Sequence, residues 1–214
     1  MIEYELMKVI VISDTHSQHA QIQLPAGDLL IHAGDITSIG KEKEVKDFLN
    51  WFESQPHPNK IFIAGNHDFY LEQTDASVIK KIIPPGVVYL KDKGTIVEGL
   101  SIWGSPYTPW FNNWAFSKQP GRQINTHWKK IPEGTDILIT HGPPFQILDE
   151  LASGILAGCP ELNKRILEIR PKYHLFGHIH EGYGKKRRMG TTHVNASVLN
   201  QYYLIQNKPI SFNI

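Results

Sequence analysis

The sequence predicts an α/β sandwich with mixed β-sheets, and three observations support this. Short apolar runs of the β type alternate with segments of helical periodicity over the first half of the chain. Closely spaced short strands follow toward its end. Five of the apolar runs are followed at once by polar side chains of the kinds that can bind metal ions. Strands that alternate with helices before a β-rich tail are typical of α/β proteins with mixed sheets, and we expect residues 1–214 to form one domain.

The strands are predicted from runs rich in Val, Ile and Leu. Five of them precede the polar clusters and cover residues 9–13, 29–32, 61–64, 137–140 and 173–176. Further strands are expected at residues 87–90, 95–97, 100–103, 192–195, 201–205 and 210–212.

Three helices are predicted between these strands, at residues 41–53, 76–83 and 160–169. The first has apolar side chains on one face, the second stops at Pro84, and the third begins at Pro160, which suits a first helical position. Residues 105–128 are expected to be irregular and rich in aromatic side chains. This segment is either a lid over a binding site or a loop that its aromatic rings anchor to the body.

Composition narrows the class of protein. The formal net charge is +1, so the chain has no overall charge that would attract nucleic acid or acidic membranes. Cys159 is the only cysteine, which excludes an intramolecular disulfide. No signal sequence is evident, and no apolar run approaches the roughly 20 residues that span a bilayer. We therefore expect a cytoplasmic protein without a membrane partner.

The polar clusters indicate a metal site. Because ligands gather at the carboxyl ends of strands in open α/β sheets, side chains that follow five strands should converge. Asp, Asn and His suit Mn, Fe, Zn or Co. Seven potential ligands are too many for one tetrahedral ion and sufficient for two ions that share a carboxylate. They are Asp14, His16, Asp35, Asn66, His141, His178 and His180.

The ordered motifs Asp-x-His, Gly-Asp, Gly-Asn-His-Asp, His-Gly and Gly-His-x-His resemble those of the calcineurin-like metallophosphoesterase superfamily. They extend from Asp14 to His180, and every motif position is filled. The segments Ser13–Ser17, His141–Pro144 and Gly177–Gly184 are similar to the small phosphodiesterase branch that includes the vertebrate brain metallophosphoesterase-domain proteins.

This resemblance implies a four-layer α/β/β/α sandwich and a site with two divalent ions. Asp14, His16 and His180 would hold one ion and Asn66, His141 and His178 the other, with Asp35 between them. A hydroxide held by both ions would attack the phosphorus in line. His67 is expected to protonate the leaving group, and Asp68 to orient the His67 imidazole or raise its pKa.

Three further residues are weaker candidates for contacts behind the ligands or with substrate. His32 is either a hydrogen-bond partner of a ligand or a buried structural histidine. His19 is either a substrate contact or an exposed bystander. Asn195 is expected either to hydrogen-bond a ligand or to close the loop behind the last two histidines. Residues 185–188 are basic, and we expect a solvated hairpin tip there rather than a site for anions.

The predicted function is hydrolysis of small phosphodiesters or cyclic nucleotides by a metal-dependent phosphodiesterase. A phosphomonoesterase or nuclease with the same ligands is an alternative, as is a catalytically weak nucleotide-binding regulatory module. The near-neutral charge argues against specific binding of long nucleic acids. A small phosphate ester or nucleotide is therefore the expected partner.

Overall fold

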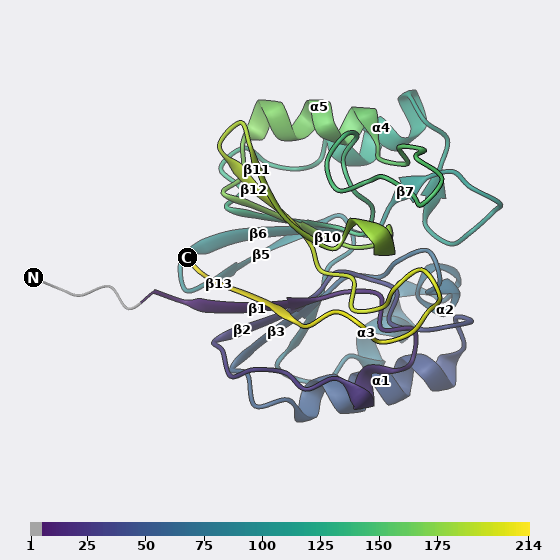
Figure 1. Ribbon diagram of the computed structural model, residues 1–214. Coiled ribbons are helices and arrows are strands. Elements are labelled where there is room, and N and C mark those ends of the chain that lie inside the picture. The colour runs from purple at the N-terminus through teal and green to yellow at the C-terminus, as the bar shows by residue number, and fades with distance from the viewer. Residues whose placement is uncertain (1–5) are drawn as a thin grey trace, which may run out of the picture.

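Two β-sheets lie face to face, with helices on both outer faces (Figure 1). The computed structural model describes residues 6–214. The layers are α/β/β/α, which confirms the predicted fold class. Among the described residues, no helix is both long and apolar enough to cross a bilayer.

The first sheet has the strand order β13-β1-β2-β3-β4. Strands β1 to β4 are parallel, and β13 is antiparallel to β1. Helices α1 (Glu42–Ser54), α2 (Phe69–Gln73) and α3 (Ala76–Ile82) lie on its outer face (Figure 1). The strands are β1 (Lys8–Ile12), β2 (Leu29–His32), β3 (Asn59–Phe62), β4 (Val87–Tyr89) and β13 (Ile210–Asn213).

The second sheet has the order β11-β12-β10-β9-β6-β5. Its four inner strands are parallel, and its two edge strands are antiparallel to their neighbours. Helices α4 (Arg122–Trp128) and α5 (Pro160–Ile169) lie on its outer face (Figure 1). The strands are β5 (Lys93–Val97), β6 (Leu100–Ser105), β9 (Ile137–Thr140), β10 (Tyr173–Phe176), β11 (Gly184–Arg188) and β12 (Thr191–Asn195).

Alternate residues of one strand fill two hydrophobic layers. Val9 and Val11 of β1 belong to the core between the sheets, whereas Ile10 packs with Phe48 and Phe52 of α1. Successive strand side chains point to opposite faces, so a fully apolar strand is needed where both faces are covered. This explains why Val9 to Ile12 of β1 are all apolar, and why every residue of β2 and of β9 is buried.

Three sequence predictions differ from the structure. Residues 201–205 do not form the predicted strand: residues 201–203 form a turn, and Ile205 makes only an isolated β-bridge to Leu199. The Asn200 side chain causes the turn, because it accepts the backbone N–H groups of Tyr202 and Leu204 at 2.9 and 3.1 Å. Residues 185–188 lie in edge strand β11, and the tip of that hairpin is formed by Met189 and Gly190.

The third difference concerns residues 105–128, which are not irregular throughout. They contain the paired short strands β7 (Thr108–Pro109) and β8 (Ser117–Lys118), and they end in α4. Phe116 and Trp128 are fully buried, so these two rings anchor the segment. Trp110 and Phe111 are exposed by 44% and 65%, so the tip of the segment faces solvent.

Candidate metal centre

The seven predicted ligands converge from both sheets. Because β1, β2 and β3 are parallel, the residues after them meet at one edge, and the residues after β9 and β10 meet there from the second sheet. Three overlapping groups of these and neighbouring residues could each hold an ion among the described residues, because within each group the ligand atoms lie within 4.8 Å of one another. They are Asp14 with His16 and His180, Asp35 with His141 and His178, and His16 with Asp35 and His67.

Asp35 lies between two of these groups. Its Oδ2 atom is 3.6 Å from His16 Nε2 and 3.2 Å from His141 Nε2. The Asn66 Oδ1 atom is 2.9 Å from the same His141 Nε2 and so completes the second group. One carboxylate oxygen is therefore within reach of both halves of the cluster, as a bridging ligand must be.

Four predicted ligands have strained backbones. Asp14, His16, Asp35 and His178 have φ angles of +56°, +40°, +56° and +69°, in the left-handed region that non-glycine residues avoid. Such strain occurs where the surrounding structure fixes a residue for function. Hydrogen bonds between the loops fix these residues here. The His178 N–H donates to both carboxylate oxygens of Asp14 at 3.0 Å, and the His67 N–H donates to Asp35 Oδ1 at 2.8 Å.

Two glycines allow this close approach. A Cβ atom at Gly177 would contact the Asp14 carboxylate and the Ser13 hydroxyl, and a Cβ at Gly65 would contact the Asp35 carboxylate. Both positions therefore require a residue without a side chain.

Backbone carbonyls orient three imidazoles. Nδ1 of His141 lies 3.0 Å from the Ala33 oxygen, and Nδ1 of His180 lies 2.9 Å from the Asn200 oxygen. Nδ1 of His67 lies 2.8 Å from the Ser38 oxygen. A carbonyl oxygen only accepts hydrogen bonds, so Nδ1 carries the proton in each ring. Nε2 of each ring is left for the cluster, the arrangement usual for histidine ligands.

The pKa values of four histidines in the cluster fall into two kinds, raised and lowered. Burial alone would lower the pKa of His141 and His180, but Asp35 and Asp14 respectively raise both to about 9. Burial lowers the pKa of His16 and His178 to about 4, so these rings are neutral. Burial alone would raise the pKa of Asp14, but His180 holds it below its usual range, and His141 does the same for Asp35. Both carboxylates are therefore ionised at neutral pH.

The residues fit divalent ions. Both ring nitrogens of His16 are buried and have no hydrogen-bond partner among the described residues. A buried nitrogen without a partner carries a desolvation cost that a bound ion would remove. Nitrogen and oxygen donors without any thiolate match ions such as Mn, Fe, Zn or Co. The seven residues predicted from sequence are therefore placed where they would hold such ions.

Two aromatic side chains that were not among the predicted site residues flank these histidines. The ring centroid of His67 lies 4.3 Å from that of Trp114 and 4.4 Å from that of His16. The Tyr203 ring lies 4.9 Å from His16 and 5.1 Å from His180. Trp114 lies in the aromatic segment 105–128, whereas no signal in the sequence marks Tyr203.

Asp68 does not have the predicted role of orienting His67. Its carboxylate accepts the backbone N–H groups of Thr37 at 2.9 Å and Gly65 at 2.7 Å, and the Thr37 hydroxyl at 2.7 Å. The Ser38 carbonyl orients His67 instead. Burial raises the pKa of Asp68 to about 7, with Asp35 adding to the shift. Asp68 thus joins the loops that carry Asp35 and His67.

The weaker candidates lie behind the cluster. Gly34 N–H donates to Nδ1 of His32 at 3.2 Å, so Nε2 is protonated and donates to the Thr15 hydroxyl at 3.0 Å. His32 therefore connects the two loops that carry Asp14 and Asp35. The Asn195 amide donates to the Ile179 carbonyl at 2.7 Å and supports the loop between His178 and His180.

His19 matches neither alternative predicted for it. It is 1% exposed, and its Nε2 lies 3.3 Å from Asp47. Its ring centroid is 5.0 Å from that of Trp51 and 5.7 Å from that of Phe48. The residue packs against α1 and belongs to none of the three ligand groups.

Comparison with known proteins agrees with this geometry. A family model described as calcineurin-like phosphoesterase matches residues 7–182. The proteins named metallophosphoesterase domain-containing protein 1 of Homo sapiens and Mus musculus are each 41% identical to this chain over 230 residues. The matched region covers 97% of this chain and 71% of each relative.

A solved structure agrees at the level of the fold. Phosphopantetheinyl Hydrolase (PptH) from Mycobacterium tuberculosis superposes with a TM-score of 0.64 at 15% identity, covering 97% of this chain and 95% of that one. At this identity the likeness concerns the fold alone. The family match and the converging ligands also support a chemical activity, the metal-dependent hydrolysis of phosphate esters. The chain therefore belongs to the calcineurin-like phosphoesterase family, and it is a metal-dependent phosphoric ester hydrolase.

Proposed function

We propose that the protein is a phosphodiesterase that uses two divalent ions and acts on small diesters or cyclic nucleotides. The observation that carries the proposal is the sharing of Asp35 Oδ2 between His16 Nε2 and His141 Nε2, at 3.6 and 3.2 Å. Two overlapping ligand sets around one carboxylate fit two ions better than one. Bound ions would lower the pKa of a water molecule and neutralise charge on the phosphoryl oxygens.

Each ion would have its own ligands. Asp14, His16 and His180 would hold the first, and Asn66, His141 and His178 the second, with Asp35 between them. Each set contains both nitrogen and oxygen donors, which Mn, Fe, Zn and Co all accept. The ligand set therefore leaves the choice among these four metals to experiment.

His67 would protonate the leaving group. Its Nδ1–H is donated to Ser38, so Nε2 is the atom available to substrate. His67 lies with His16 and Asp35 in one of the three groups, next to the place where a phosphoryl group would bind. An imidazolium there can give its Nε2 proton to a departing alkoxide, which is ordinary general-acid catalysis.

A small substrate is the expected partner. The formal net charge of +1 supplies no broad basic surface for a long nucleic acid. The likeness to the small phosphodiesterase branch, seen in Ser13–Ser17 and Gly177–Gly184, supports a diester over a monoester.

Hydrolysis of paired chromogenic esters tests the proposal. Metal-stripped protein receives Mn, Fe, Zn or Co, and the rates with bis(p-nitrophenyl) phosphate and p-nitrophenyl phosphate are compared. We expect metal-dependent turnover with a higher kcat/KM for the diester. No metal-dependent turnover of either ester, or an unchanged rate in Asn66→Ala, would contradict the proposal. A higher kcat/KM for the monoester would instead support a phosphomonoesterase.

Leaving groups of different basicity test the role of His67. His67→Ala should slow cleavage of methyl phenyl phosphate by about 10²–10⁴-fold. Cleavage of methyl p-nitrophenyl phosphate should slow by a smaller factor, because p-nitrophenolate departs readily without a proton. His57→Gln is the matched control, since within residues 6–214 that ring hydrogen-bonds only to the Pro25 carbonyl, away from the cluster. Equal losses for both leaving groups would assign His67 a different role.

A further inference from the structure

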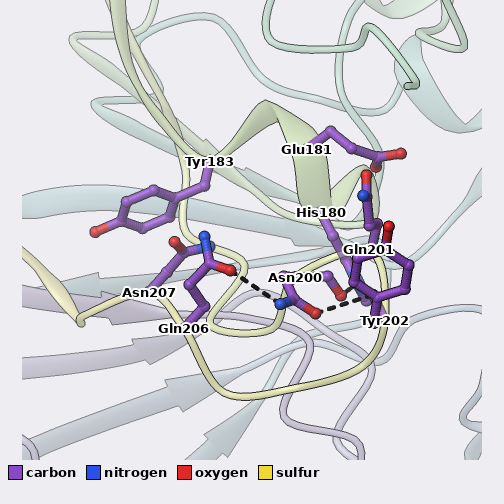
Figure 2. A pocket seen from close by; sticks show the side chains of 8 residues that line it. All are labelled: His180, Glu181, Tyr183, Asn200, Gln201, Tyr202, Gln206 and Asn207. Atoms are coloured by element: carbon purple, nitrogen blue, oxygen red, sulfur yellow. Dashed lines mark hydrogen bonds between the residues drawn. The ribbon is translucent and has the colours of Figure 1, made fainter. Parts of the chain in front are cut away.

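A polar pocket lies beside the metal centre. Its volume is about 390 Å³, within the roughly 300–1,000 Å³ range of small-molecule sites. His180, one of the proposed ligands, forms part of its wall, so the pocket adjoins the place where a phosphoryl group would bind. In Figure 2, Tyr183, Gln206 and Asn207 lie on one side of the pocket, and Glu181, Gln201 and Tyr202 lie on the other.

The turns after β12 are held in place, so the pocket is preformed. The Asn200 amide donates to Gln206 Oε1 at 2.9 Å, and Asn200 Oδ1 accepts the Tyr202 N–H at 2.9 Å (Figure 2). The carbonyl of the same Asn200 accepts the proton on His180 Nδ1. Asn200 therefore joins the wall of the pocket to the metal centre.

Several polar groups of the wall have no partner within residues 6–214. The Gln201 amide makes no side-chain hydrogen bond, and Gln206 uses only its oxygen. Asn207 donates to Ser197 and leaves its amide oxygen free, and Glu181 uses only one carboxylate oxygen, to accept the Ala152 N–H. Donors and acceptors are thus both available around one space.

This mixture of free donors and acceptors favours a ligand that carries hydroxyl groups. A hydroxyl group both donates and accepts hydrogen bonds, so it can pair with amide nitrogens and with amide or carboxylate oxygens. No lysine or arginine lines this pocket among the described residues, and Glu181 would repel a second anion. The rings of Tyr183 and Tyr202 add flat apolar surface, which the carbon skeleton of a polyhydroxy alcohol can cover.

We propose that this pocket binds one alcohol group of the diester substrate, and that this group is a neutral polyhydroxy alcohol such as a glycerol or sugar unit. The inference rests on the proposed phosphodiesterase activity. The phosphoryl group would lie at the ions, with one ester group at His67 and the other beside His180.

Two diesters with the same three-carbon ester group test the proposal. Glyceryl p-nitrophenyl phosphate and propyl p-nitrophenyl phosphate share the leaving group and differ only in two hydroxyls. For wild-type protein we expect kcat/KM to be about tenfold higher for the glyceryl diester, the effect of one or two added hydrogen bonds. Gln201→Leu should reduce that preference at least threefold, because kcat/KM for the glyceryl diester should fall more than kcat/KM for the propyl diester. Gln23→Leu is the matched control, because Gln23 is exposed and lies outside the pocket.

Three results would overturn the proposal: equal kcat/KM for the two diesters, a Gln201→Leu variant that slows both equally, or a preference for the corresponding choline diester. A binding measurement, which needs no hydrolysis, tests the pocket proposal independently of the proposed phosphodiesterase activity. Calorimetry on metal-loaded protein compares glycerol 3-phosphate with propyl phosphate. Tighter binding of glycerol 3-phosphate that Gln201→Leu abolishes supports the pocket assignment even if neither diester is hydrolysed, whereas equal binding contradicts it.

Discussion

Metal binding should release protons, because two proposed ligands carry an extra proton in the metal-free protein. Asp35 and Asp14 raise the pKa of His141 and His180 to about 9. Both ring nitrogens of His141 lie against oxygen acceptors, Ala33 O at 3.0 Å and Asn66 Oδ1 at 2.9 Å, as expected of an imidazolium. A metal ion must replace one proton on each of these two rings.

The size of the effect follows from the pKa values. At pH 7 each histidine is about two pKa units below its midpoint, and each unit corresponds to about 1.4 kcal/mol. Proton displacement therefore costs about 2.7 kcal/mol per ion, or about 100-fold in affinity at pH 7. His16 and His178, with pKa values of about 4, are already neutral and add nothing. Each ion should release about one proton, and its affinity should rise about tenfold per pH unit up to about pH 9.

Calorimetric titration measures this release. Metal-stripped protein is titrated with Mn at pH 7 in buffers of different ionisation enthalpy, and the slope of observed enthalpy against buffer enthalpy gives the protons released. We expect about two per chain at saturation. His57→Gln should give the same slope as wild type. Two bound ions with no proton release, or an affinity that is unchanged between pH 6.5 and 8, would refute this electrostatic account of the site.

Three further predictions concern residues that support the fold and the site. Asp68→Ala should lower the free energy of unfolding, measured in urea, by about 2–5 kcal/mol, since it leaves the buried donors of Thr37 and Gly65 without an acceptor. Asp68→Asn should lower that free energy by less, and an equal loss in both variants would contradict this. Gly177→Ala should reduce metal-dependent turnover at least 100-fold, because the new Cβ would contact the Asp14 carboxylate, and near wild-type turnover would show that the loop can move. Burial alone would raise the pKa of Asp92, but hydrogen bonds from His127 and Lys130 lower it, so its stabilising effect is present above about pH 3.8 and is lost at lower pH. Asp92→Asn should therefore lower the urea midpoint at pH 7, and the difference from wild type should narrow below about pH 4; a difference independent of pH would contradict the assignment.

Much of the fold and the ligand set was predictable because the relevant signals are local. The strands β1, β2 and β9 are apolar on both faces, so their runs stand out in the sequence, and the side chains that follow them converge because the strands are parallel. His178 and His180 belong to different groups, as the family resemblance implied.

Other features depend on contacts that spacing does not encode. Residues 201–205 look like a strand in sequence, but Asn200 uses its side chain to bind the backbone and turns the chain. That turn places Tyr203 against His16 and His180. Asp68 follows His67 in sequence, yet its carboxylate accepts hydrogen bonds from Thr37, about 30 residues earlier, and the Ser38 carbonyl orients the imidazole instead. Such roles depend on loop geometry, which sequence spacing alone does not reveal.

The most direct test of two ions sharing Asp35 is a crystal structure of the protein loaded with Mn or Zn, with anomalous scattering used to locate the metal. We expect two peaks about 3.5–4 Å apart, one among Asp14, His16 and His180 and the other among Asn66, His141 and His178, with the Asp35 carboxylate between them. A single peak at saturating metal, or two peaks without Asp35 between them, would contradict the account.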